Sequence, residues 1–320
     1  MLQFLYWLKA LTAVLITNSH YAHIWPISSL AVGGQLGNCL FFFISGFTLY
    51  HIKAAFPKWY AKRIIRVYPA LWMVNIIFFL LGRFSADSLI AVIHCFIFPT
   101  WFHFVGSIML LYLFYYFIRT IQKHWKIDTR WIMLAVLILD LVLYLVFFDK
   151  TYYHIDDVER SWVRFMFFES MLIGAWFREQ YDRISPRISA WHYGLFAALS
   201  LTYFGGKLLF SRVPDASAFQ FLLPVILLIY VGWIAVLFIK FEKNCYFTKI
   251  TSWVSTVIKA VADMTLEIYL VQFPLIDYLH KYSFPVNFLL TTGAILLCAW
   301  ITHFIAIKIK VGCEKTLHLE

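Results

Sequence analysis

The chain has 320 residues, of which 62% are hydrophobic and 14% are charged. Soluble domains are about half apolar and about a quarter charged, so this composition excludes a soluble globular protein and indicates a polytopic membrane protein. The net charge of +10 reflects basic cytoplasmic loops in such a protein, and no nucleic acid is expected as a partner.

The first apolar run, Phe4 to Trp25, contains two ionisable residues, Lys9 and His20. They are eleven residues apart, which in a helix is three turns plus roughly 20°, so both project from one face about 16 Å apart. A charge in lipid costs at least about 2.5 kcal/mol, and such residues usually face a bundle interior. Snorkelling of Lys9 to the headgroups and a packing role for His20 are the structural alternatives; for His20 we favour a functional site.

Apolar runs of spanning length occur at 4–24, 35–54, 67–82, 103–122, 131–148, 161–179, 189–210, 218–241, 261–280 and 285–309. With the N-terminus in the cytoplasm, 19 of the 27 lysines and arginines fall on the inner side and 7 on the outer side, and the remaining one, Lys9, lies inside the first span. This bias fits the positive-inside rule. An eleventh apolar segment at 89–99 is too short to cross the bilayer. The sequence therefore predicts an all-α bundle of ten transmembrane helices, with both termini cytoplasmic and a re-entrant or interfacial segment at 89–99.

This bundle accounts for the whole chain, 1–320, as a single transmembrane domain embedded in the lipid bilayer. The five cysteines are widely spaced, and they indicate neither a disulfide framework nor a metal site. His51, His94, His192 and His303 have no second ligand at metal spacing, so no metal is expected. Asp140, Arg164, Glu169 and Glu267 lie in apolar runs, where they can form interhelical ion pairs or belong to a site. Structural pairing is the default interpretation for Asp140 and Arg164, and for Glu267 the two interpretations are even.

A basic stripe precedes the third span. Lys58, Lys62 and Arg66 follow each other at four-residue spacing, with Arg63 beside them. Anionic lipid headgroups are one ligand for such a stripe. Paired arginines at the cytoplasmic end of a membrane helix also suit the phosphates of a cofactor, because each guanidinium can donate two parallel hydrogen bonds.

Several motifs together resemble the membrane-bound acyltransferase-3 family. They are Lys9-x10-His20, Gly37 with Phe42-Phe43-Ile44-Ser45-Gly46-Phe47, Arg63-Ile-Ile-Arg66-Val-Tyr68-Pro69, Trp101-Phe-His103-Phe-Val-Gly106, and Thr265-Leu-Glu267-Ile-Tyr269-Leu-Val-Gln272. The match involves spans one to four and nine, and the middle of the chain aligns by hydropathy alone.

The resemblance implies a multi-pass enzyme of the bacterial cytoplasmic (inner) membrane. It would transfer an acyl group, usually acetyl, from cytoplasmic acyl-CoA to a hydroxyl of a cell-surface or exported polysaccharide or its lipid-linked precursor. Acetyl-CoA would be the donor substrate, and the glycan acceptor would be the other partner. The oligomeric state stays open.

The resemblance also implies roles for residues. His20 would be the catalytic base, Lys9 would stand where the family has an arginine, and Glu267 would belong to the same site. CoA would bind Arg63 and Arg66, with Lys58, Lys62 and Tyr68 beside them. Trp101 and His103 would lie where the acceptor approaches.

Three positions depart from the family pattern. Lysine at Lys9 keeps the charge but loses the bidentate fork of arginine. The acid expected after Trp101 is missing, with Gly106 and Ser107 nearby instead, and the histidine that many members have in span nine is Gln272 here. If a carboxylate orients His20, Glu267 or Glu169 must supply it.

Two alternatives from other classes remain. A transporter or flippase for a lipid-linked or anionic glycan would also bury charges, but it would need proton-relay residues across the bundle, and these are sparse. A catalytically silent partner of a glycan-assembly complex is compatible with the lysine at Lys9. The basic stripe beside the Lys9–His20 face favours the transferase.

Overall fold

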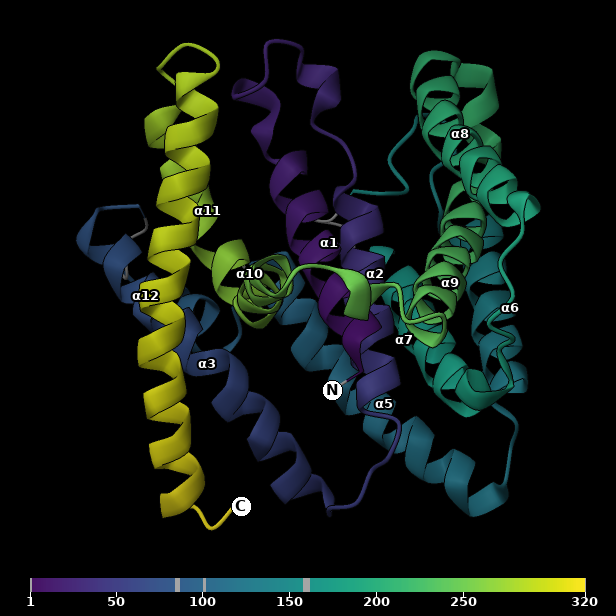
Figure 1. Cartoon of the computed structure of the whole chain (residues 1–320), viewed down its shortest axis with the longest axis horizontal. Helices are drawn as coiled ribbons and strands as arrows, with labels where there is room; N and C mark the ends of the chain where they lie inside the picture. Colours follow the sequence, from purple (N-terminus) through teal and green to yellow (C-terminus); the bar gives the residue numbers. More distant parts are fainter. Residues whose placement is uncertain (1, 84–86, 100–101, 158–161, 320) are drawn as a thin grey trace. The chain divides into compact units, whose positions relative to one another are not determined.

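A computed structural model describes residues 2–83, 87–99, 102–157 and 162–319 (Figure 1). Within these ranges the regular structure is helical throughout. The helices are α1 (Gln3–Ser19), α2 (Gly34–Thr48), α3 (Phe56–Leu80), α4 (Leu89–Val92), α5 (His103–Trp125), α6 (Thr129–Phe147), α7 (Val163–Gln180), α8 (Ala190–Arg212), α9 (Leu222–Lys243), α10 (Ser252–Asp263), α11 (Thr265–Leu279) and α12 (Val286–Thr316). The all-α prediction is confirmed for the part of the chain that the structure describes.

Seven helical segments in the described ranges are long and apolar enough to cross a membrane. They are Ser28–Thr48, Phe56–Leu80, His103–Trp125, Thr129–Phe147, Ala190–Arg212, Leu222–Lys243 and Val286–Thr316. Each corresponds to one of the ten predicted spans. The other three predicted spans coincide with α1, α7 and α11. The helices α1 and α11 have 17 and 15 residues, or about 26 and 23 Å, and α7 carries two arginines and two glutamates. The count of ten and the cytoplasmic termini stay predictions.

The chain divides into two compact units that are each assembled from separate stretches of sequence. Unit 1 comprises residues 1–8, 38–51 and 117–256, and unit 2 comprises 9–37, 52–116 and 257–320. The divisions fall inside α1, α2, α5 and α10, so these helices contribute residues to both units. The single-domain prediction remains a prediction.

In unit 1, α7 packs against α6 and α9, and α8 packs against α9. The helix α2 meets α7 through two glycines. A Cβ at Gly46 would overlap the carbonyl oxygen of Met171, and a Cβ at Gly174 would overlap that of Phe43. Ser170 donates a hydrogen bond to the Cys39 carbonyl at 2.6 Å in the same contact. The two glycines therefore allow the backbones of α2 and α7 to touch.

The C-terminal end of α9 binds the loop that follows α7. Lys240 Nζ donates to the carbonyls of Ser185 and Arg187, both at 2.7 Å. Lys243 Nζ donates to Tyr181 at 2.7 Å and Ile184 at 2.8 Å. These bonds hold the segment after α7, which includes the turn η4 (Tyr181–Arg183), against the end of α9.

In unit 2, α3, α11 and α12 pack against one another (Figure 1). The start of α2 lies close to α1, because a Cβ at Gly37 would stand 2.7 Å from Ile16 Cγ1. Gly33 has a φ of +103°, a conformation that favours glycine. Gly37 therefore allows the close packing of α2 on α1.

The segment predicted to be re-entrant or interfacial, 89–99, forms α4 followed by the π-helical turn η3 (Ile93–Ile97). Three side chains of α3 bind consecutive carbonyls of this turn. Tyr68 donates to Ile97 at 2.6 Å, Trp72 donates to Phe96 at 2.7 Å, and Asn75 donates to Cys95. Carbonyls at a helix end lack intrahelical partners, so α3 caps this short helix. Its placement relative to a membrane stays a prediction.

Candidate functional site

The helix α1 carries Lys9 and leads directly into His20. The helix ends at Ser19, and the His20 amide bonds back to the Thr17 carbonyl at 3.1 Å, which tightens the last turn. Asn18 binds the carbonyls of Leu30 and Val32 at 2.8 and 3.0 Å. The predicted helix to Trp25 is therefore interrupted at His20, one residue beyond its regular part, where the anchored loop fixes the backbone.

The imidazole of His20 packs against a group of aromatic rings from α11 and from Phe102, the residue before α5. We call this group the aromatic wall. The His20 ring packs edge-on against Phe273 with the centroids 4.8 Å apart. Phe273 in turn contacts Tyr269 at 5.8 Å and Phe102 at 6.1 Å. His20 is thus partly buried in apolar surroundings, where a ring nitrogen has few competitors for a polar substrate group.

Lys9, at the other end of this stretch of α1, belongs to a group of charges from three helices. Lys9 is partly buried, and Arg66 of α3 and Asp263 of α10 are close enough to interact electrostatically with it. The structure therefore places Lys9 with one of the predicted phosphate-binding arginines, on the helix that leads to His20.

The basic stripe lies along the first half of α3. Arg63 stacks over the ring of Trp59 at 4.7 Å, and its Nε has no hydrogen-bond partner among the described residues. Arg66 is exposed, and Lys62 is partly exposed. Lys58 donates to the carbonyl of His318 at 3.2 Å. The guanidinium of Arg63 is therefore stacked on an indole ring, and that of Arg66, one turn further along α3, is exposed.

Tyr68, the fifth residue predicted to bind CoA, has its hydroxyl on the Ile97 carbonyl. Its visible role is thus to cap η3, and its role in binding stays a prediction. His103 is the first residue of α5 and is partly buried. Trp101 lies outside the described residues. In the described ranges no three His, Cys, Asp or Glu residues group as a metal site would need.

Glu267 has a partner that the sequence did not identify. Its Oε1 lies 3.0 Å from Nδ1 of His303 on α12, and the two side chains are 8% and 21% exposed. Its other oxygen, Oε2, is buried without a hydrogen-bond partner in the described part of the chain. The sequence signal for His303 is an ionisable residue inside the last apolar run, and the lack of metal spacing around it does not exclude a partner on a neighbouring helix.

A family model described as an acyltransferase domain matches residues 2–307. The chain belongs to the membrane acyltransferase-3 family. The match includes every predicted site residue, from Lys9 to Glu267, as well as His303. No curated protein and no solved structure matches the chain.

This acyltransferase is therefore an all-helical, multi-pass membrane protein in the part of the chain that the structure describes. Lys9, His20, the α3 stripe, His103 and Glu267 all belong to unit 2. The alternative of a transporter receives no support from these findings. The roles of the individual residues stay predictions, because neither the fold nor the family match tests them.

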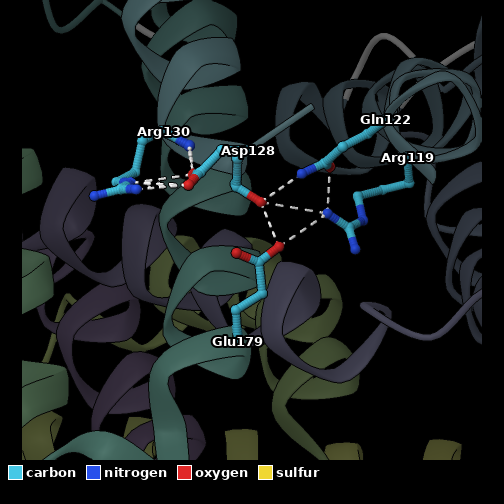
Figure 2. Close-up of polar contacts among 6 residues, drawn as sticks. Arg119, Gln122, Asp128, Arg130 and Glu179 are labelled. Carbon is cyan, nitrogen blue, oxygen red and sulfur yellow. Dashed lines mark hydrogen bonds and ion pairs between the residues drawn. The ribbon is translucent and has the colours of Figure 1, made fainter. Parts of the chain in front are cut away.

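The acyltransferase has a second polar cluster in unit 1, formed by Arg119, Gln122, Thr129 and Glu179 (Figure 2). Arg119 bonds to Gln122, pairs with Glu179 at 3.5 Å and stacks over Tyr50 at 4.1 Å. It ties the end of α5 to α7.

Asp128, beside this cluster, caps α6 through the Arg130 amide at 2.9 Å. Hydrogen bonds from Arg130 lower the pKa of the Asp128 carboxyl. The contacts of Arg119 and Asp128 are explained by joining helix ends, and we assign the cluster a structural role.

Proposed function

We propose that the protein is an O-acyltransferase that moves an acyl group, with acetyl preferred, from acyl-CoA to a hydroxyl of a polysaccharide or its lipid-linked precursor. The observation that supports this most strongly is the arrangement along α1 in unit 2. Lys9 and the exposed Arg66 mark one end, and His20 lies about 16 Å away at the other. Such a stretch suits a donor with an anionic head and a reactive group at the end of a long arm.

The phosphates of CoA would bind Arg63 and Arg66, with Lys58 and Lys62 adding positive charge. Arginine presents paired donors that match phosphate oxygens, and an exposed guanidinium is free to do so. Lys9 would add a charge where the head meets the arm. In the cytoplasmic membrane of a bacterium this end would face the cytoplasm, where acyl-CoA is made.

His20 would act as the general base. It takes the proton from the acceptor hydroxyl while the hydroxyl oxygen attacks the thioester carbonyl carbon. The carbon–sulfur bond then breaks, and the imidazolium returns the proton to the leaving thiolate, which gives the ester and free CoA. A positioned base of this kind contributes about 10²–10⁴-fold, and a histidine is suited to it near neutral pH. Trp101 and His103 would contact the acceptor.

Binding of acetyl-CoA to the purified protein in detergent tests the donor site. We expect saturable binding that is lost in the double variant Arg63→Ala/Arg66→Ala and kept in His20→Ala, which should bind without turnover. The matched control is Arg183→Ala/Arg187→Ala, which removes two exposed arginines of unit 1 and should bind like wild type. Absence of binding by folded wild-type protein would contradict the proposal.

A further inference from the structure

The pair of Glu267 and His303 joins α11 to α12 inside unit 2. The 3.0 Å contact between Oε1 and Nδ1 is a hydrogen bond in which the imidazole N–H donates to the carboxyl oxygen. Because the imidazole is attached to a packed helix, this bond restricts the rotation of the Glu267 carboxyl group.

The restricted carboxyl group has one oxygen in use and one oxygen free. Oε2 of Glu267 is buried and has no hydrogen-bond partner in the described ranges, and the residue as a whole is 6% exposed. A buried acceptor without a donor is costly, and native proteins rarely leave one unpaired. An N–H or O–H group that arrives with a substrate would satisfy it.

The position of Glu267 indicates which substrate brings that group. Asp263 precedes it by four residues, and both Asp263 and Arg66 are close enough to His303 for their charges to interact. Phe273, whose ring packs against the imidazole of His20, follows Glu267 by six residues, or about 9 Å of helix. Along α11, Glu267 therefore lies between the charged group at Arg66 and the aromatic wall at His20.

We propose that Oε2 of Glu267 accepts a hydrogen bond from the pantetheine arm of acyl-CoA, and that His303 is the positioning residue that holds this oxygen in place. The arm carries two amide N–H groups and one hydroxyl, and all of them are donors. It must pass between the phosphate-binding end and the acyl group. This inference rests on the proposed function, because it takes acyl-CoA as the donor.

A purely structural pair would give a different result. If His303 and Glu267 only fasten α11 to α12, removing either one weakens folding and leaves the affinity of the folded protein for every part of CoA unchanged. The positioning role instead predicts a loss that is confined to ligands with the arm.

The experiment compares two probes, acetyl-CoA and adenosine 3′,5′-bisphosphate, which has phosphates on the same nucleoside but no arm. Binding is measured by calorimetry on wild type, His303→Phe, His303→Asn and Glu267→Gln. The amide of His303→Asn places an N–H close to the position of Nδ1. Glu267→Gln removes the negative charge of the acceptor and replaces one of its two oxygens with an NH2 group, so the arm loses a charged hydrogen-bond partner. Leu297→Ala, on the exposed face of α12, is the control.

We expect His303→Phe and Glu267→Gln to bind acetyl-CoA about 10-fold to 100-fold more weakly, the range for a hydrogen bond to a charged group. The bisphosphate should bind all variants equally, and His303→Asn should recover most of the affinity for acetyl-CoA. The double variant His303→Phe/Glu267→Gln should bind acetyl-CoA no more weakly than Glu267→Gln alone, because the two substitutions remove the same contact.

Three results would overturn the inference: unchanged acetyl-CoA affinity in folded His303→Phe, an equal loss for both probes, or no recovery in His303→Asn. If wild type binds the bisphosphate and acetyl-CoA with the same affinity, the arm makes no contact and the inference is wrong, while the phosphate site stands. If wild type binds neither probe, the proposed function itself fails.

Discussion

The imidazole of His20 lies edge-on against the ring of Phe273, with the centroids 4.8 Å apart. His20 is outside the regular part of α1, so helical backbone bonds alone do not orient it. Phe273 belongs to α11, which packs against α3 and α12. The orientation of the proposed base is therefore set by a packed helix.

Replacing Phe273 with alanine should lower kcat about tenfold and leave the affinity for acetyl-CoA unchanged, because His20 would sample more orientations while the α3 stripe is intact. Edge-to-face pairs are worth about 0.5–1.5 kcal/mol beyond burial. Steady-state kinetics on Phe273→Ala and Phe273→Tyr measures this, and the tyrosine variant should stay near wild type. Equal activity in all three proteins would show that Phe273 does not orient the base.

Gly174→Ala should destabilise the protein by about 3 kcal/mol or more, because the new methyl group would overlap the Phe43 carbonyl and the two packed backbones would have to separate. Gly46→Ala should behave alike. The control is Gly194→Ala in α8, where a Cβ meets nothing within 4 Å and alanine should stabilise the helix by about 1 kcal/mol. Thermal unfolding in detergent compares the three, and equal midpoints for Gly174→Ala and Gly194→Ala would contradict the close contact.

The sequence predicted the positions of the long helices correctly, but it did not predict the residue at which α1 ends. Long apolar runs fixed the positions of the seven candidate spans because burial in lipid demands about 20 apolar residues. The segment that follows the end of α1 at Ser19 is held by contacts from residues far along the chain. Among them, Asn287 donates to the Ile24 carbonyl at 2.9 Å. Hydropathy contains no information on such bonds.

The site was predicted in part for the same reason. Periodicity placed Lys9 on α1 and the basic stripe on α3, since both patterns are local, whereas the helix predicted to include His20 ends one residue before it, at Ser19. The pairing of Glu267 with His303 spans 36 residues and depends on how α11 and α12 pack. Likewise Tyr68 looked like a ligand residue beside Arg66, and only the fold shows its hydroxyl on Ile97.

Lys243→Met should free the loop after α7 while leaving the helices folded. The change removes three hydrogen bonds to the carbonyls of Tyr181, Asp182 and Ile184 and keeps the aliphatic length of the side chain. Amides of residues 181–187 should then exchange at least about tenfold faster, since each lost bond contributes about 1 kcal/mol. Hydrogen exchange with mass spectrometry measures this. Lys123→Met, an exposed lysine of α5, is the control, and unchanged exchange in Lys243→Met would refute the anchoring role.

Gln272 is fully buried on α11, and neither its Oε1 nor its Nε2 has a hydrogen-bond partner among the described residues. An unpaired buried amide costs about 1–3 kcal/mol, so Gln272→Leu, which keeps the volume and removes both polar atoms, should raise the free energy of unfolding by about 1 kcal/mol. Thr265→Val is the comparison, because Thr265 is buried on the same helix but bonds to the Ala262 carbonyl at 2.9 Å, and its replacement should not stabilise. Thermal unfolding of both variants without ligand decides the matter. A lower unfolding midpoint for Gln272→Leu would mean that the amide is paired in the folded protein. A higher midpoint together with reduced turnover would show that the buried amide serves the reaction at the expense of stability.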